Sequence, residues 1–339
     1  MSVPSAKKDI PITHDFGIGF DLNPSYGTVA VSYPNGSLQT IARVEGNQAY
    51  REMMLRLSLP SSQHFHEPYD DLGKQFQDMP RMMWRQFRKR LGLPASWDAG
   101  TLSEMIRDLR AEAESHVEEH VSVAGISIPH LIALYDEDII DAFKYISLMY
   151  LEFFPYADAW YYTLPATLAA YAGYGLGLCP NITDFDACRE MEWQIPKRFV
   201  LSISYTHTGL VTSQARLGDA WSIHESPMRE DLSLGLNERD HRENYWEDVR
   251  DLLRSPVVDS WRRENVTGVL LLGDAVDEPK FREILKEVVE ELIWGEQEIY
   301  DQDPIFNPVR RTAELTKRGI FLLKNGLSRR VKLIEEDEL

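Results

Sequence analysis

An acidic side chain and two hydroxyl groups come together in a predicted turn near the start of the chain. Asp21 ends an apolar run, Ser25 and Tyr26 lie in the turn, and a second apolar run begins at Val29. Two strands joined in this way form a hairpin whose inward-pointing backbone N–H groups can hold phosphate. Pro24 has no N–H group to donate. The pattern predicts a phosphate or other ligand site around Asp21 that has lost one donor.

A second cluster of candidate ligands lies in a polar segment. Residues 64–71 hold two histidines and three carboxylates, and Asp70 and Asp71 are candidate ligands for a divalent metal or for a diphosphate held through Mg²⁺. An exposed polar loop explains the same composition and is favoured. His116 and His120 fit the H-x-x-E-H pattern of some zinc proteases, with both histidines on one helix face. A solvated helix face is the favoured interpretation there as well.

Hydrophobic periodicity divides the chain into two halves with a similar plan. Strands are expected at 16–22, 27–33, 38–43 and 123–128, and in the second half at 199–204, 209–215 and 220–223. Helices are expected at 48–58, 75–91 and 102–118, and after Pro129. Each half therefore opens with a strand meander and continues with a strand–helix unit, so the predicted fold class is α/β with two related lobes.

Several motifs follow one another in a fixed order. They are Asp21-Leu22, Tyr26, Asn35-Gly36, Gly46-Asn47, Gly125–Pro129, Pro165–Leu176 and Val269–Phe281. In this order and spacing the chain resembles the nucleotide-binding domain of the 70-kDa heat-shock chaperones, a branch of the actin-like ATPase superfamily. The resemblance implies a two-lobed actin-like ATPase fold built from duplicated ribonuclease-H-like units, with ATP and Mg²⁺ bound between the lobes. The family's peptide-binding domain is not expected in this chain.

The resemblance also implies the domain boundaries. A flexible N-terminus, lobe I, lobe II, a C-terminal helix that returns to the lobe interface and an acidic tail are expected at 1–14, 15–195, 196–299, 300–328 and 329–339.

Several parts of the family's nucleotide site differ in this chain. The second phosphate loop, rich in glycine and acids in the chaperones, matches Ser204–Val211, which holds no acid and one glycine. Leu164 stands where the family has a glutamate, and Asp274 replaces a glycine. Asp277 replaces the arginine that stacks on adenine. Only Glu238–Trp261 separates the second meander from the last strand, so lobe II has a reduced helical subdomain.

The residues that still match form a residual nucleotide or ligand cleft at Asp21, Ser25, Tyr26 and Gly273. The resemblance implies that Asp21, which matches an acid that organises Mg²⁺ in the family, is the candidate catalytic residue and a candidate metal ligand. Each donor to the transition state is typically worth a few kcal/mol, and no lysine matches the family's catalytic lysine convincingly. ATP with Mg²⁺ is therefore expected to bind weakly and to be hydrolysed little or not at all.

Composition excludes some classes of partner. The 339 residues carry a formal net charge of −18, whereas general nucleic-acid binding requires clustered basic residues. Residues 159–183 hold no charged side chain, but proline, glycine and scattered polar residues interrupt them, so a buried linking helix is expected there and no membrane span. The chain has two cysteines and an N-terminus without a signal-like apolar stretch, which favours a cytoplasmic or nuclear setting.

Three functions of different classes fit these observations. The favoured one is a degenerate ATPase fold that acts as a scaffold for a protein partner. The second is an enzyme with a repurposed cleft between the lobes. Aromatic residues of the run 145–174 would line its pocket, and it would act with Mg²⁺ on a lipophilic or diphosphate-bearing molecule, for example in terpenoid-type chemistry. The third is a nucleotide sensor without hydrolysis.

Overall fold

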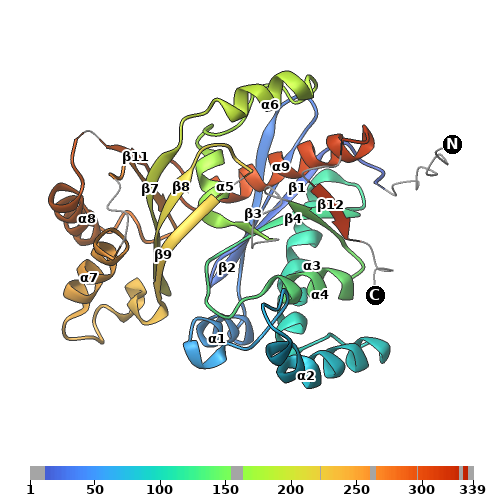
Figure 1. Cartoon of the computed structure of the whole chain (residues 1–339), viewed down its shortest axis with the longest axis horizontal. Coiled ribbons are helices and arrows are strands. Elements are labelled where there is room, and N and C mark those ends of the chain that lie inside the picture. The colour runs from blue at the N-terminus through green and yellow to red at the C-terminus, as the bar shows by residue number, and fades with distance from the viewer. Residues whose placement is uncertain are drawn as a thin grey trace.

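Two mixed β-sheets form the frame of the computed structural model, which describes residues 12–153, 163–221, 223–259, 265–295, 297–327 and 331–334 (Figure 1). The first sheet has the order β12-β5-β4-β1-β2-β3, and the short β6 also pairs with β4. Its strands are β1 (Gly17–Leu22), β2 (Tyr26–Ser32), β3 (Leu38–Glu45), β4 (Val123–Ile128), β5 (Met149–Phe153), β6 (Leu164–Pro165) and β12 (Val331–Ile334). The second sheet has the order β11-β10-β7-β8-β9. Its strands are β7 (Arg198–Thr206), β8 (Gly209–Leu217), β9 (Ile223–Asp231), β10 (Gly268–Leu272) and β11 (Glu298–Tyr300).

The two sheets share one plan. In the first sheet, β1, β2 and β3 are antiparallel neighbours, β4 pairs with β1 in parallel, and β5 pairs with β4 in parallel. In the second sheet, β7, β8 and β9 are antiparallel neighbours, β10 pairs with β7 in parallel, and β11 pairs with β10 in parallel. This repeated order is compatible with a two-lobed α/β fold. We call the part around the first sheet lobe I and the part around the second sheet lobe II.

Helices cover both sheets. They are α1 (Gln48–Leu57), α2 (Leu72–Arg90), α3 (Trp97–Val117), α4 (Asp136–Tyr145), α5 (Ala166–Gly173), α6 (Phe185–Trp193), α7 (Tyr245–Val258), α8 (Pro279–Leu292) and α9 (Asn307–Lys324). Phe20 on β1 packs in one core with residues of α1, α3 and α4, and Phe281 on α8 packs in a second core with β7, β10 and α7. A third core joins both sheets, because Leu168 of α5 and Leu315 of α9 pack with Val123 of β4 and Val200 of β7. The helices α5 and α9 therefore connect the lobes (Figure 1).

Most predicted elements are confirmed, and the differences have physical causes. The strand expected at 220–223 lies instead at Ile223–Asp231, where Pro227 and several charged residues hide the strand pattern. This is the edge strand of its sheet, and edge strands tolerate proline. The helix expected directly after Pro129 begins only at Asp136, because a hydrogen-bonded turn from Leu131 to Leu134 comes first.

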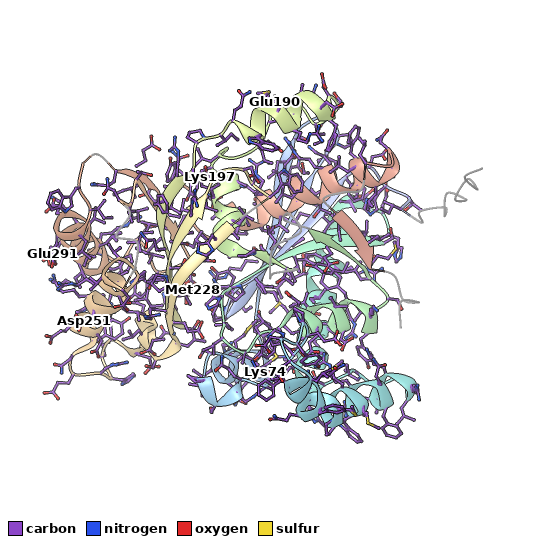
Figure 2. The ribbon with its side chains drawn as sticks, viewed as in Figure 1. Lys74, Glu190, Lys197, Met228, Asp251 and Glu291 are labelled. Carbon is purple, nitrogen blue, oxygen red and sulfur yellow. A yellow bond between two sulfur atoms is a disulfide. The ribbon has the colours of Figure 1, made fainter. Side chains whose placement is uncertain are left out.

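Several acidic side chains lie on the outer surface. Glu190 on α6, Asp251 on α7 and Glu291 on α8 are exposed, and Figure 2 shows them at the periphery. No helix of the described residues is long and apolar enough to cross a membrane. Cys179 and Cys188 form a disulfide, with 5.2 Å between their Cα atoms, and it fixes the segment that leads into α6. The sequence pattern did not indicate this pairing.

Candidate functional site

Asp21 lies at the end of β1, where the first sheet faces the second. Its side chain is only 4% exposed, and Ser127 Oγ on the neighbouring β4 donates a hydrogen bond of 2.6 Å to Asp21 Oδ1. Thr312 Oγ1 on α9 donates in turn to Ser127 Oγ at 2.9 Å. Burial raises the pKa of Asp21 to about 7, against the smaller opposing effect of the hydrogen bond from Ser127. This carboxyl group therefore changes charge near neutral pH.

A cavity of about 30 Å³ lies between the lobes at Asp21. The acid of lobe II at this cavity is Glu225 on β9, which accepts hydrogen bonds from Thr167 Oγ1 at 2.8 Å and from Ser213 Oγ. Burial raises the pKa of Glu225 above its ordinary value. Asn23 also lines the cavity, and its buried Oδ1 has no hydrogen-bond partner among the described residues. A space of this size suits about one water molecule.

The structure brings some of the predicted cleft residues together. Asp21, Tyr26 and Gly273 line the same cavity, with Gly273 at φ +99 beside the end of β7. Ser25 is buried next to Tyr26 but is not one of the residues that line the cavity. Asp70 lies elsewhere, at the start of α2, where its side chain pairs with Lys74 Nζ at 2.6 Å.

An ion pair closes one end of this cleft. Arg43 Nη2 on β3 lies 2.8 Å from Asp274 Oδ2, in the turn after β10, so the pair joins lobe I to lobe II. The backbone N–H of His207 donates to the other oxygen of Asp274 at 3.1 Å, and the Arg43 guanidinium lies 3.9 Å from the centre of the Tyr26 ring. Burial alone would raise the pKa of Asp274, but the hydrogen bonds from His207 and Arg43 hold it below its ordinary value. Asp274 thus ties the two lobes together.

The described aromatic residues of the run 145–174 do not gather at this cavity. Tyr145 is exposed, Tyr171 is buried and donates to the carbonyl oxygen of Gly218, and Tyr174 contacts the ring of Tyr300. Residues 154–162 of the run lie outside the described residues. In the described part of the chain, the rings that line the cavity are those of Tyr26 and His130.

The predicted metal clusters have other roles in the structure. Asp71 is the N-cap of α2, because its Oδ1 accepts the backbone N–H of Lys74 at 2.9 Å. His64 and His66 both pack on the ring of Tyr135, with ring centres 4.3 and 4.2 Å apart. Neither feature requires a metal.

The two histidines of the H-x-x-E-H pattern do not share a helix face. The helix α3 ends at Val117 and Glu118 turns left-handed at φ 56, so His120 lies beyond the helix. Its Nδ1 pairs with Glu114 at 3.0 Å, and His116 Nε2 lies 3.0 Å from Gln39 Oε1. The two cysteines and Glu192 are close enough together for a metal site. The two sulfur atoms are bonded to each other in the disulfide, so they offer no thiolate to a metal.

The helix α2 exposes an apolar face. Residues spaced three or four apart form a stripe, in which Phe76 is 65% and Met83 66% exposed. We call this set the α2 stripe, and its members are Leu72, Phe76, Met79, Met83, Phe87 and Leu91. Trp84 stacks on Phe87 beside the stripe, with ring centres 5.5 Å apart. An amphipathic helix normally buries this face, so its exposure here is unusual.

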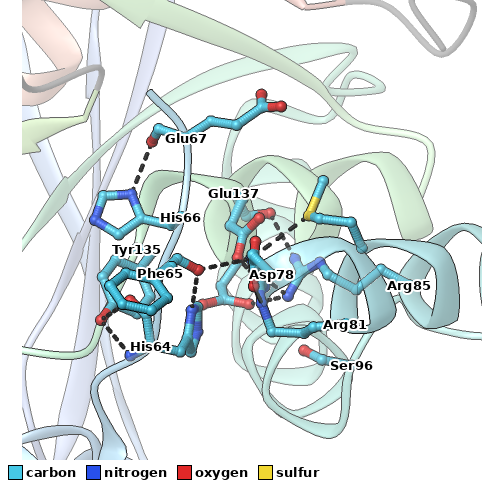
Figure 3. Close-up of polar contacts among 12 residues, drawn as sticks. His64, Phe65, His66, Glu67, Asp78, Arg81, Arg85, Ser96, Tyr135 and Glu137 are labelled. Carbon is cyan, nitrogen blue, oxygen red and sulfur yellow. Dashed lines mark hydrogen bonds and ion pairs between the residues drawn. The ribbon is translucent and has the colours of Figure 1, made fainter. Parts of the chain in front are cut away.

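Charged residues attach α2 to the rest of lobe I. Arg85, 5% exposed, pairs with Asp138 Oδ1 at 2.7 Å and with Asp141 Oδ2 at 2.6 Å, both on α4. Arg81 pairs with Asp78 of its own helix and with Glu137 of α4 (Figure 3). The helix therefore directs its charged face inward and its apolar face toward solvent, the reverse of the usual arrangement.

No protein-family model and no curated protein matches the chain.

The sequence pattern does not indicate that acids of β9 belong to the site. Glu225 and Glu230 lie on the strand that was expected elsewhere, and burial raises the pKa of Glu230 to about 7. Burial also lowers the pKa of the neighbouring His130 to about 4, so this imidazole is neutral at ordinary pH. Their chain positions give no local signal, because only the pairing of β9 with β8 brings Glu225 to the cleft.

Proposed function

We propose that this protein is a degenerate chaperone-type ATPase fold that hydrolyses little or no ATP and acts as a scaffold for a protein partner. The repeated strand order of the two sheets supports the actin-like interpretation of the fold, since each lobe starts with a three-stranded meander and continues with parallel strands. The observation that carries the scaffold function is the inverted orientation of α2.

The geometry of the cleft supports the loss of nucleotide chemistry. A nucleotide needs far more room than the cavity of about 30 Å³ at Asp21. The pair Arg43–Asp274 joins the lobes at this cleft. The end of β7 and the turn after it hold Thr206, His207 and Thr208 where the chaperones have glycines. The enzyme alternative has less support, because a lipophilic or diphosphate-bearing substrate does not fit this space either.

The α2 stripe supports binding of a protein. Aromatic residues, methionine and arginine are enriched in protein interfaces, and Phe76, Met83, Trp84 and Phe87 provide a continuous series of such residues along one helix. Burying several of these side chains against a partner would remove enough apolar surface to stabilise a complex. Nothing in the described part of lobe I covers the stripe, since its members are 42% to 70% exposed.

The charge near the stripe indicates the chemistry of the partner. Arg88, Lys89 and Arg90 form the last turn of α2, in a chain with a net charge of −18. Lys89 pairs with Asp141 of α4 at 3.1 Å, whereas Arg88 and Arg90 form no ion pair with a described residue. The matching surface is an apolar groove on a protein with acidic residues at one end, which would receive this basic turn. Such a groove accepts an amphipathic helix through residues spaced three and four apart.

The scaffold function can be tested with the triple variant Phe76→Ser, Met83→Ser, Phe87→Ser. We expect the wild-type chain to capture a partner from an extract of its source cells. The purified partner should then bind by calorimetry with at least tenfold lower affinity for the variant, because the variant loses the anchoring side chains. Circular dichroism should be unchanged, since the substituted residues are exposed.

The matched control is the double variant Met191→Ser, Trp193→Ser, which removes exposed apolar side chains from α6. Its affinity for the partner should equal that of the wild type. Equal affinity of the triple variant would refute the role of α2. The role would also be refuted if ultracentrifugation showed that the stripe mediates only self-association of this chain. Binding of the stripe only to vesicles with anionic lipid would refute it as well.

A further inference from the structure

A second, larger cavity lies away from the cleft between the lobes. It is a polar groove of about 970 Å³ between the β2–β3 turn, the segment before α6 and the helix α9. Figure 1 shows α9 crossing the first sheet, and α9 contacts β3. Pro34–Gly36, Pro180–Thr183 and several charged residues of α9 line the groove.

The charge of this groove is opposite to that of the chain. Arg310, Arg311, Lys317 and Arg318 line it together with one acid, Glu314. The carboxylate of Glu314 is fully used: it accepts Lys317 Nζ at 2.6 Å and Arg318 Nε at 2.9 Å, and Ser32 Oγ donates to it as well. The α9 side of the groove therefore has an excess of positive charge in a chain of net charge −18.

Arg311 has no counter-ion of its own. The neighbouring Arg310 pairs with Asp303 at 2.5 Å, but no described residue forms an ion pair or a hydrogen bond with the Arg311 guanidinium. Burial lowers the pKa of Arg311 to about 10, and Arg318 lowers it further against the attraction of Glu314. A partly buried guanidinium without a partner costs folding free energy, which an anion in the groove would offset.

Amide groups on the other walls add hydrogen-bond donors. Asn35 Oδ1 accepts the backbone N–H of Ser37, and Asn181 Oδ1 accepts the backbone N–H of Thr183. Both oxygens are thus used locally, while neither Nδ2 group donates to a described residue. Donors of this kind suit an anion.

The wall that carries Asn181 is firmly fixed. The disulfide between Cys179 and Cys188 closes this segment, and Arg318 Nη2 donates to the carbonyl oxygen of Cys179 at 2.8 Å. The donors on this wall therefore keep a defined position relative to α9.

We propose that this groove binds a small polyanion, a phosphorylated or polycarboxylate metabolite, with Arg311 as its principal charge partner. Guanidinium groups bind phosphate and carboxylate through paired hydrogen bonds, and the groove offers one such group that no protein acid neutralises. This site is separate from Asp21 and from the α2 stripe, so it does not depend on the proposed scaffold function.

Calorimetric titration with inorganic pyrophosphate and, separately, with citrate tests the proposal. The full chain in low salt should bind at least one of the two, and the choice between them tells whether phosphate or carboxylate is preferred. Arg311→Gln should weaken this binding at least tenfold, and added salt should weaken it in the wild type. Arg254→Gln on α7, a half-exposed arginine paired with Glu291, is the matched control and should bind like the wild type.

A thermal melt of the unliganded variant separates binding from folding. Because Arg311→Gln removes an unpartnered charge, we expect the variant to melt at the same temperature as the wild type or higher while its affinity falls. The proposal is overturned if neither anion binds the wild type at millimolar concentration, or if Arg311→Gln binds as tightly as the wild type.

Discussion

Gly19→Ala is expected to destabilise the protein strongly, by about 3 kcal/mol or more. A Cβ atom at Gly19 would lie 2.2 Å from the backbone nitrogen of Ala313 and 2.8 Å from its Cα. These atoms belong to the backbone of α9, which cannot rotate away as a side chain can, so α9 would have to move off β1. The same helix carries Thr312, whose hydroxyl supports Ser127 beside Asp21. The close contact of β1 with α9 is thus what places the cleft acid.

Urea unfolding of the wild type and variant measures this effect. Gly100→Ala on α3 is the control, because a Cβ there would meet only the Pro94 side chain, at 3.2 Å or more. The control should change stability by less than about 1 kcal/mol, since alanine favours a helix. An unchanged urea midpoint for Gly19→Ala would show that α9 does not approach β1 this closely.

Asp21→Asn is expected to stabilise the protein above neutral pH. The pKa of Asp21 is about 7 in the folded chain and 3.8 ordinarily. Between these values the folded state binds a proton that the unfolded state has released, so stability falls as the pH rises. Above the folded pKa the cost of the buried charge is on the order of 4 kcal/mol. Asparagine keeps an oxygen that can accept the hydrogen bond from Ser127 and never becomes charged.

The measurement is urea unfolding at about pH 5 and about pH 8. The variant should exceed the wild type in stability clearly at the higher pH and much less at the lower one. Asp186→Asn changes an exposed acid on α6 and should leave the pH dependence of the wild type in place. If Asp21→Asn lowers stability equally at both pH values, Asp21 acts as a charged structural group and its pKa is not raised in the folded chain.

Local patterns predicted much of the secondary structure. The apolar runs of β1 and β2, the helical periodicity of α1 and α3 and the alternation in β7 and β8 all lie in short stretches of chain. The shared order of the two sheets follows from these elements, because a meander followed by a parallel strand recurs in each half. Edge strand β9 was misplaced, since its solvent-exposed side removes the apolar alternation.

Long-range pairings could not be predicted. The spacing of Phe76 and Met83 correctly indicates a helix but would place this face in the core. The opposite occurs because Arg85 finds Asp138 and Asp141 on α4, more than fifty residues further along the chain. Glu225 reaches the cleft through a strand pairing in lobe II. The lack of a partner for Arg311 among the described residues is recognised only when all walls of the groove are known.

The most direct test of the central claim is calorimetric titration of the wild-type chain with ATP and with ADP, each with Mg²⁺, together with a measurement of ATP turnover. The account predicts no nucleotide binding at the cleft at concentrations up to about 1 mM and little or no turnover, because the cleft at Asp21 has no room for a nucleotide. Arg311→Gln is included so that any binding at the groove of α9 is recognised. Micromolar binding that survives Arg311→Gln and is lost in Asp21→Ala would contradict the account and make the cleft between the lobes a nucleotide site.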